Sequence, residues 1–267
     1  MAVDLEMIGP VAVLKLNEPT AMNALTPDEL IELRKQLRAC QDNGDIRCII
    51  LTGEGKKAFC AGANLKKTFP PARSFAANLL LGRDAEAADG GYTRLLDLSD
   101  LQIWKPIIAA VNGYCLGGGL ELALQCDIRI ASESASFGLP EVKVASVPAV
   151  GGVQLLLRAV PAAHAMKLAL TGMRIDAGQA LSIGLVSDVV AADKLLPFCL
   201  DIASQITANG PLAVQHVKKL AQETAHLPPE QFIAQSNTVW GLLRDSADRI
   251  EGRNAFGEKR TPHYTGN

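Results

Sequence analysis

The sequence predicts a mixed α/β fold. Two apolar runs long enough for buried strands, residues 47–52 and 107–111, each lead to a loop of glycine and alanine. From Asp193 onward the apolar residues recur at helical spacing, with breaks at Pro211 and Pro228-Pro229. A chain of 267 residues is within the range of one layered domain. We therefore expect a main core over residues 1–195 and a helical region over residues 196–267 that packs on the core or on a partner chain.

The first part of the chain predicts a hairpin and a helix. Apolar and acidic residues alternate over residues 3–7, and a second strand follows Gly9-Pro10 at residues 11–16. Thr26 precedes Pro27 and two acids, which is the pattern of a helix start, and Leu30, Leu33 and Leu37 continue it at helical spacing. We expect this helix to end near Asn43-Gly44.

Residues 68–91 predict an excursion from the core. The segment begins with Pro-Pro and ends with Gly-Gly, and residues 76–81 are helical in composition. We expect a mobile, partly helical segment that could act as a lid.

The second part of the chain continues the alternation of strands and helices. Strands are expected at residues 128–130, 137–141 and 186–190, and helices from Gly151-Gly152 to Val160, from Pro161 onward and over residues 175–185.

Composition excludes several classes of protein. The formal net charge is −2 and aromatics make up 4% of the chain, so we expect no nucleic-acid partner. Six cysteines without a C-x-x-C pair read as reduced and mostly buried. No apolar run reaches the roughly 18 residues of a membrane span, and the N-terminus resembles no signal peptide, so we expect no membrane association and a cytoplasmic location.

Common catalytic and cofactor motifs are absent or incomplete. Gly53-Glu54-Gly55-Lys56 lacks the spacing and hydroxyl of a phosphate loop, and Gly113 to Gly119 lacks the spacing of a dinucleotide fingerprint. The four histidines show no metal-ligand spacing, so no metal is expected. Cys60 and Cys115 lie near glycine turns, but packing is the better explanation for both. The lysines at 56, 57, 66 and 67 could be solvated charge or could steer a phosphate-bearing ligand.

Residues 105–127 predict a strand, a glycine turn and a buried helix. Gly117-Gly118-Gly119 opens this helix with amides that no side chain covers, and Glu121 lies in its first turn. Glu121 could simply satisfy the helix dipole. The alternative combines Glu121 and Glu141 as acid and base with the amides of Ala63 and Gly118 as an oxyanion hole. In that arrangement one carboxyl group is protonated near neutrality and the other is ionised.

The same segments resemble the crotonase (enoyl-CoA hydratase/isomerase) superfamily. The resemblance lies in residues 16–25 (LNEPTAMNAL), 58–65 (AFCAGANL), 105–127, 137–141 (FGLPE) and 256–260 (FGEKR). It implies a crotonase-type spiral of ββα repeats in residues 1–195. It also implies that residues 196–267 form a helical trimerisation region, giving a homotrimer or a dimer of trimers. The implied substrate is an acyl-CoA thioester, with no cofactor apart from the CoA of the substrate.

The resemblance also implies roles for particular residues. Ala63 and Gly118 match the oxyanion-hole amides, and Glu121 and Glu141 match the two catalytic glutamates of the hydratase branch. The implied contacts to the CoA are Ala24, Ala61, Asn64, Leu65, Lys66, Phe256 and Lys259. We therefore expect an enoyl-CoA hydratase in which Glu121 takes a proton from water and Glu141 protonates Cα. The alternatives are an isomerase, a carnitinyl-CoA-dehydratase-like lyase, or a non-catalytic CoA- or RNA-binding homologue.

Two positions depart from the hydratase pattern. Ala149 stands where hydratases commonly have a glycine whose backbone helps to position the water. Asn64 replaces the usual aspartate and keeps a side chain able to make local hydrogen bonds. The first departure bears on the preferred substrate, and we expect the second to be tolerated.

Overall fold

The computed structural model describes residues 3–67, 73–83, 85 and 93–267. Their strands form two sheets, one of six strands in the order β1-β2-β3-β5-β7-β10 and one of four in the order β4-β6-β8-β9. The six-stranded sheet comprises β1 (Val3–Ile8), β2 (Val11–Leu16), β3 (Cys48–Gly53), β5 (Ile107–Val111), β7 (Ile128–Ser132) and β10 (Asp188–Val190). The four-stranded sheet comprises β4 (Ala58–Cys60), β6 (Tyr114–Leu116), β8 (Ser136–Gly138) and β9 (Arg174–Asp176).

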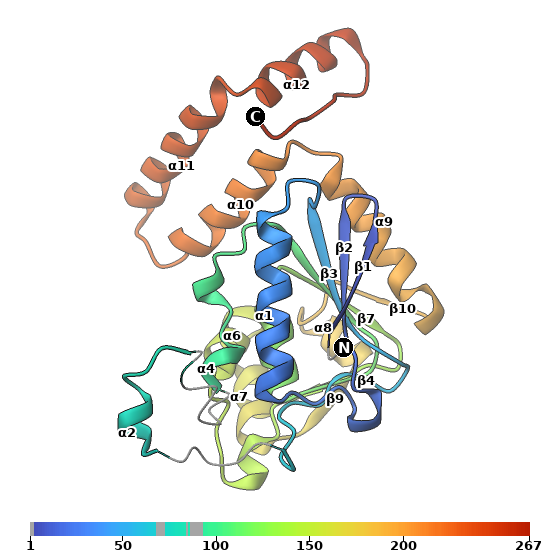
Figure 1. Cartoon of the computed structure of the whole chain (residues 1–267), viewed down its shortest axis with the longest axis vertical. Helices are drawn as coiled ribbons and strands as arrows, with labels where there is room; N and C mark the ends of the chain where they lie inside the picture. The colour runs from blue at the N-terminus through green and yellow to red at the C-terminus, as the bar shows by residue number, and fades with distance from the viewer. Residues whose placement is uncertain (1–2, 68–72, 84, 86–92) are drawn as a thin grey trace.

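The inner strands β2, β3 and β5 of the six-stranded sheet are buried on both faces. β1 and β2 form the predicted antiparallel hairpin, and all further pairs in this sheet are parallel. Alternate side chains enter two apolar clusters, so Leu14 and Leu51 pack with α1 (Pro27–Asp42) whereas Val13 and Ile50 pack with α9 (Leu195–Thr207). Figure 1 shows α1 and α9 along opposite faces of this sheet.

Successive strands pass from one sheet to the other. β3 is followed by β4, β5 by β6 and β7 by β8, so each pair adds one strand to each sheet. The turn between β5 and β6 needs glycine, because a Cβ at Gly113 would lie 2.2 Å from the carbonyl oxygen of Lys57. This repeated ββ arrangement places the loops after β4 and β6 side by side.

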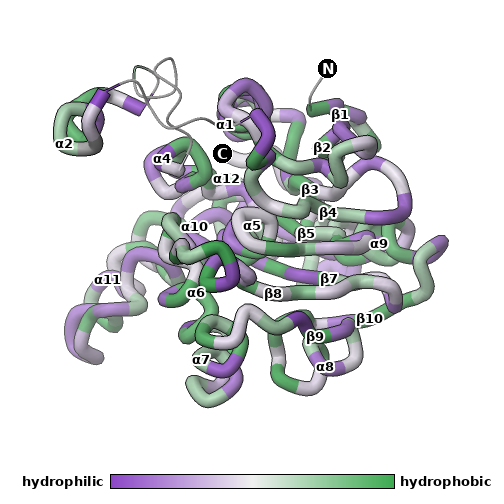
Figure 2. Tube along the Cα trace, turned by 90° about the horizontal axis from the view of Figure 1, so that it is seen from below, coloured by the Kyte–Doolittle hydropathy of each residue, from purple (hydrophilic) through white to green (hydrophobic). Residues whose placement is uncertain are grey.

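Short helices lie between and after the strands. They are α2 (Phe75–Asn78), α4 (Thr93–Leu96), α5 (Gly118–Leu124), α6 (Gly152–Ala159), α7 (Ala162–Thr171) and α8 (Ala177–Ser182), with the 3-10 turns η1 (Pro19–Ala21), η2 (Ser99–Leu101), η3 (Glu141–Val144) and η4 (Ala192–Lys194). α5, the predicted buried helix, lies beside α6 and the second sheet (Figure 2). The predicted start of α1 is confirmed, since Thr26 and Glu29 form a capping box.

One predicted helix is too long. Residues 175–185 contain β9 followed by α8, because residues 174–176 pair antiparallel with β8 and Asp176 then caps the helix. Strand pairing with a distant segment therefore overrides the local helical pattern. Of the predicted excursion, residues 68–72, 84 and 86–92 lie outside the described residues, and its mobility and role as a lid stay predictions.

The C-terminal helices extend from the core. They are α10 (Pro211–Thr224), α11 (Pro229–Arg244) and α12 (Ala247–Glu258), and Figure 1 shows them at one end of the molecule. Lys218 of α10 is 8% exposed and joins them to the core, since its Nζ lies 2.7 Å from Asp127 Oδ2 and donates to the Lys105 carbonyl at 3.0 Å. Both ends of the central 105–127 segment are thus held by one side chain of the helical region.

Candidate active site

The loops after β4 and β6 are in direct contact. A Cβ at Gly62 would lie 3.0 Å from the Leu116 carbonyl oxygen and 3.3 Å from the Gly118 nitrogen, and a Cβ at Gly119 would lie 2.1 Å from the Cys60 carbonyl oxygen. Side chains at these positions would push the loops apart. The small residues of both loops therefore allow the backbones of Ala63 and Gly118 to approach each other.

The amide of Ala63 is available for a ligand. Leu25 donates its N–H to the Gly62 carbonyl at 2.7 Å and accepts from the Asn64 N–H at 2.9 Å, so the Ala63 amide lies between two backbone hydrogen bonds that do not use it. Across the described ranges, the Ala63 N–H donates to no protein acceptor.

The amide of Gly118 is also available for a ligand, because the first N–H groups of a helix have no acceptor within that helix. Gly118 is the first residue of α5 and follows Gly117, whose φ of 55° and ψ of −126° suit glycine alone. The N–H groups of Leu120 and Glu121 donate to the Gly117 carbonyl, whereas that of Gly118 has no acceptor among the described residues. An oxyanion hole needs unpaired donors held close together, and these two amides are unpaired and lie on touching loops.

Glu121 is buried beside these amides and is held by a third loop. Its side chain is 2% exposed, and its Oε1 accepts from the N–H groups of Val150 at 2.8 Å and Gly152 at 3.0 Å. Burial raises the pKa of Glu121 above its ordinary value, and the two amides oppose this rise. The simpler explanation of Glu121 as a dipole cap does not account for these bonds, because they come from outside α5.

Glu141 begins η3 and lies against the Gly117 loop. Its Oε1 would be 3.0 Å from a Cβ at Gly117, and its buried Oε2 has no hydrogen-bond partner in the described structure. Burial raises the pKa of Glu141, and the charge of Glu121 raises it further. An unpartnered buried carboxyl oxygen needs a partner, which a ligand or a proton could supply.

Five of the predicted CoA contacts lie on two neighbouring segments, since Leu25, next to Ala24, forms a bridge with Ala63. Ala24 is buried, Ala61 and Asn64 are half-buried, and Leu65 and Lys66 are exposed. Asn64 makes the expected local bond, since its Oδ1 accepts from the Lys66 N–H at 3.2 Å.

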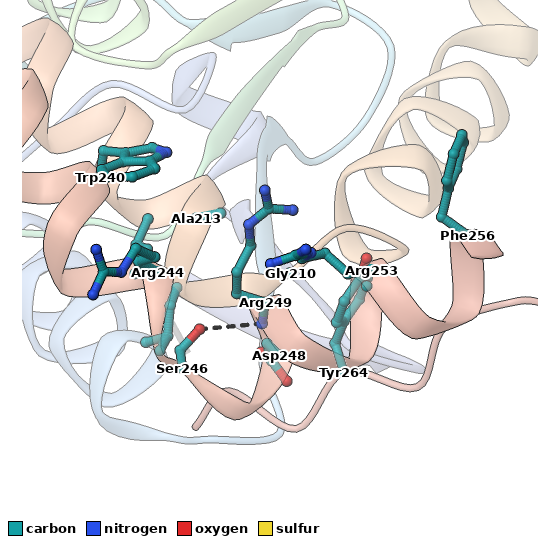
Figure 3. A pocket seen from close by; sticks show the side chains of 13 residues that line it. Gly210, Ala213, Trp240, Arg244, Ser246, Asp248, Arg249, Arg253, Phe256 and Tyr264 are labelled. Carbon is teal, nitrogen blue, oxygen red and sulfur yellow. Dashed lines mark hydrogen bonds between the residues drawn. The ribbon is translucent and has the colours of Figure 1, made fainter.

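Phe256 and Lys259 lie elsewhere. Phe256 is 87% exposed on α12, and Lys259 caps that helix. α12 and β4 lie toward opposite ends of the molecule in Figure 1, so one chain does not bring these two residues to the glycine loops. Phe256 instead lies at one side of a cavity of about 590 Å³ that Trp240, Arg249 and Tyr264 also line (Figure 3). That Phe256 and Lys259 contact CoA stays a prediction, and in this arrangement the contact would have to be made to a site on another copy of the chain.

The sequence does not reveal the loop that holds Glu121. Val150 and Gly152 follow Ala149, the position that departs from the hydratase pattern, and the Ala149 side chain is exposed. A Cβ at Gly152 would lie 2.8 Å from both Cγ and Oε1 of Glu121. The Gly151-Gly152 pair before α6 is the only local sign of this contact.

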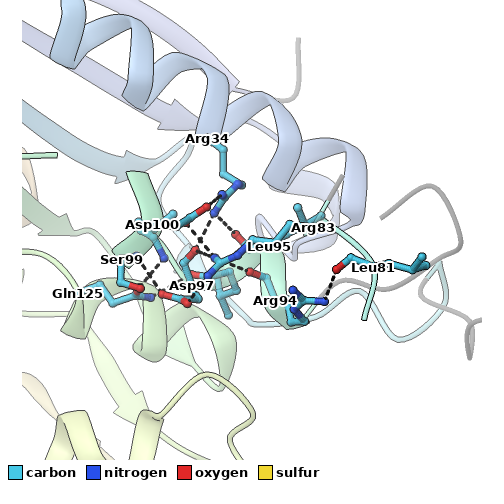
Figure 4. Close-up of polar contacts among 11 residues, drawn as sticks. Arg34, Leu81, Arg83, Arg94, Leu95, Asp97, Ser99, Asp100 and Gln125 are labelled. Atoms are coloured by element: carbon cyan, nitrogen blue, oxygen red, sulfur yellow. Dashed lines mark hydrogen bonds and ion pairs between the residues drawn. The ribbon is translucent and has the colours of Figure 1, made fainter. Parts of the chain in front are cut away.

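An arginine cluster lies near Gln125, the residue that ends α5 (Figure 4). Arg83 binds the carboxylates of Asp97 at 2.7 Å and Asp100 at 2.9 Å, and Arg34 of α1 binds Asp100 at 2.6 Å. Gln125 links this cluster to α5, because its amide nitrogen donates to the carbonyls of Leu96 and Glu121. The cluster fastens the described part of the excursion to α1 and α4.

The described residues contain no group of three or more histidine, cysteine, aspartate or glutamate side chains placed to hold a metal ion. None of the described helices combines the length and the apolar character that a bilayer crossing requires.

The chain is similar to known proteins over its whole length. Residues 6–267 match the family model described as enoyl-CoA hydratase/isomerase. The (E)-benzylidenesuccinyl-CoA hydratase of Thauera aromatica is 46% identical over 266 residues, covering 100% of both chains. The 2,3-dehydroadipyl-CoA hydratase of Escherichia coli is 37% identical over 96% of this chain and 95% of that protein. The crystal structure of an enoyl-CoA hydratase from Bacillus anthracis superposes with a TM-score of 0.89 at 34% identity, covering 100% of both chains.

These relatives confirm the fold class and the hydratase assignment predicted from the sequence. They also support an acyl-CoA thioester as the substrate. The chain belongs to the enoyl-CoA hydratase/isomerase family.

Proposed function

We propose that the chain adds water across the 2,3 double bond of an enoyl-CoA thioester by means of Ala63, Gly118, Glu121 and Glu141. The observation that carries this proposal is the conjunction of two unpaired amides on touching loops with two buried carboxyl groups of raised pKa. An isomerase needs only one acid–base group, whereas water addition uses two.

The amides act on the thioester oxygen. Water attack at Cβ moves negative charge onto that oxygen, and the N–H groups of Ala63 and Gly118 stabilise the enolate-like state. A single oxyanion-hole donor is worth about 3 kcal/mol in comparable sites.

The hydrogen bonds divide the roles of the glutamates. Two amides bind Oε1 of Glu121 and favour its ionised form, so Glu121 accepts the proton of the attacking water. Glu141 lacks such a partner at Oε2 and feels the charge of Glu121, so it holds a proton and delivers it to Cα. The bonds that break are one O–H bond of water, the O–H bond of Glu141 and the π bond between Cα and Cβ. The bonds that form are the C–O bond at Cβ, the C–H bond at Cα and an O–H bond on Glu121. Transfer of a proton from Glu121 to Glu141, directly or through solvent, then restores the starting state.

The names of two relatives suggest which acyl groups to test first. Benzylidenesuccinyl-CoA and 2,3-dehydroadipyl-CoA carry an additional carboxylate, and the first also carries an aryl group. We propose acyl groups of this kind as the first candidates beside crotonyl-CoA. Loss of the enoyl-thioester absorbance would report hydration, and a panel in which no enoyl-CoA is hydrated would contradict the proposed reaction.

We also propose that the chain forms a homotrimer or a dimer of trimers through its C-terminal helices. α11 contains no buried residue, and Trp240 and Leu242 are 60% and 68% exposed. Apolar side chains of this size gathered on one region favour a protein partner. Light scattering coupled to size exclusion would give the number of chains.

A further inference from the structure

Two consecutive residues near the oxyanion loop have left-handed backbones. Met22 has a φ of 56° and Asn23 a φ of 53°, and neither is glycine. Such conformations are unfavourable for residues with a Cβ, although asparagine tolerates them better than most. A pair of them persists only where surrounding contacts hold it.

The side chain of Asn23 supplies those contacts. It is 2% exposed, and its Oδ1 accepts from the Glu18 N–H at 3.0 Å. Its Nδ2 donates to the carbonyl of Glu54 at 3.0 Å and to that of Ala58 at 2.8 Å. One buried carboxamide thus joins three separate backbone segments, including the first residue of β4.

The residues beside Asn23 hold the other end of the same loop. The Met22 carbonyl accepts from the Ala61 N–H at 3.1 Å, and Leu25 makes the two bonds that flank the Ala63 amide. Residues 22–25 therefore form a backbone template for residues 61–64. The direction of the Ala63 N–H follows from this template, because Leu25 bonds the backbone of Gly62 on one side of Ala63 and of Asn64 on the other.

We propose that Asn23 is a positioning residue for the oxyanion hole. Its carboxamide fixes the left-handed turn at residues 22–23 against β4, and the turn in turn aims the Ala63 N–H at the thioester oxygen. Asn23 itself touches no reacting atom. The inference rests on the proposed function of Ala63.

Two substitutions separate the parts of this device. Asn23→Asp keeps the acceptor for Glu18 and the tolerance of a left-handed backbone but loses both donors. Asn23→Gly removes the whole side chain, and glycine adopts the left-handed backbone conformation without steric cost. Asn112→Asp is the matched control, because Asn112 also binds the 53–55 turn, donating to the carbonyls of Gly53 and Gly55 at 2.8 Å each, but makes no bond to residues 58–64.

The decisive measurement is spectroscopic. A conjugated enoyl-CoA chromophore bound to the wild type should absorb at longer wavelength, because the oxyanion hole polarises its carbonyl. We expect both Asn23 variants to bind this probe with a dissociation constant within about threefold of wild type, to lose most of the shift and to lose at least about tenfold in kcat. Asn112→Asp should keep the wild-type absorbance shift, even if its melting temperature falls as much as that of the Asn23 variants.

Other results would overturn the inference. An undiminished absorbance shift in folded Asn23→Asp and Asn23→Gly would show that the carboxamide does not orient the Ala63 amide. If Asn112→Asp lost the shift to the same extent, the role of the Asn23 carboxamide would be general support of the turn. A wild-type shift without turnover would contradict hydration while leaving the shift comparison decisive for Asn23. Absence of any shift in the wild type would overturn both the oxyanion hole and its positioning residue.

Discussion

The amide of Gly152 donates to Oε1 of Glu121 at 3.0 Å, and the Gly152 Cα lies so close to that carboxylate that no Cβ fits between them. Gly152→Ala should displace the carboxylate and lower kcat by about tenfold to a hundredfold with little change in KM. Gly178→Ala is the control, because its Cβ would find the nearest atom at 3.5 Å. A similar loss in both variants would show that the effect is not specific to Glu121.

The two glutamates should be separable from substrate binding. Glu121→Gln and Glu141→Gln remove a proton acceptor and a proton donor, so each should lower kcat by orders of magnitude while KM stays close to wild type. Steady-state kinetics with the best enoyl-CoA of the panel checks this. A mild effect at Glu121 would instead favour isomerisation by a single acid.

The buried charge of Glu121 should also oppose folding. Burial raises its folded pKa above the ordinary 4.5, so the native state binds this proton more tightly than the unfolded chain. Stability from this group is therefore present at low pH and is lost as pH rises from 4.5 through the folded pKa.

Glu121→Gln removes this pH dependence. The glutamine oxygen can still accept from Val150 and Gly152, so at pH 8 the variant should melt at or above the wild-type melting temperature. At pH 5 the difference in melting temperature in the variant's favour should be smaller. Melting curves across this range test the sign. A variant that loses more stability at pH 8 than at pH 5 would contradict it.

The arginine cluster should hold the described part of the excursion. Arg83→Gln removes the ion pairs to Asp97 and Asp100. A protease that does not cleave at arginine or lysine should therefore cut within residues 73–85 faster, while the melting temperature of the protein falls only slightly. Lys35→Gln is the control, since Lys35 is 75% exposed and lies 3.8 Å from Glu32. Equal cleavage rates in both variants and the wild type would remove the cluster's anchoring role.

Phe256 and Lys259 should contact the CoA that is bound to a second copy of the chain. Phe256→Ala and Glu141→Gln should each lower activity alone. Mixed assemblies of the two variants should regain part of it, because some sites then combine an intact Glu141 with an intact Phe256 from a neighbour. Refolded mixtures assayed against unmixed variants provide the measurement, and no gain on mixing would speak against a contact across chains.

Local sequence patterns predict much of this fold and miss what depends on distant pairing. The alternation in β1, the apolar β5 and the capping box at Thr26 each depend on neighbouring residues, so the sequence identifies them. β9 forms because residues 174–176 pair with β8, whereas the local pattern predicts that a helix begins at Ile175.

The site shows the same division. Small residues in both loops point to free backbone amides, which identifies Ala63 and Gly118 from the sequence. The Val150 amide reaches Glu121 across 29 residues of chain, and no local pattern encodes that contact. The left-handed pair at Met22 and Asn23 is almost as well hidden. Asparagine adopts a positive φ more often than most residues, but methionine gives no sign of one.

The position of α9 has a consequence for the chain during its synthesis. Leu195, Cys199 and Ala203 cover Val13, Ile50 and Ile108, which lie at the centre of the six-stranded sheet. A nascent chain that has reached only the end of β10 has made all six strands but presents one apolar face of them to water. The emerging protein therefore depends on helix α9 to close its core, and a fragment that stops before this helix should aggregate rather than fold.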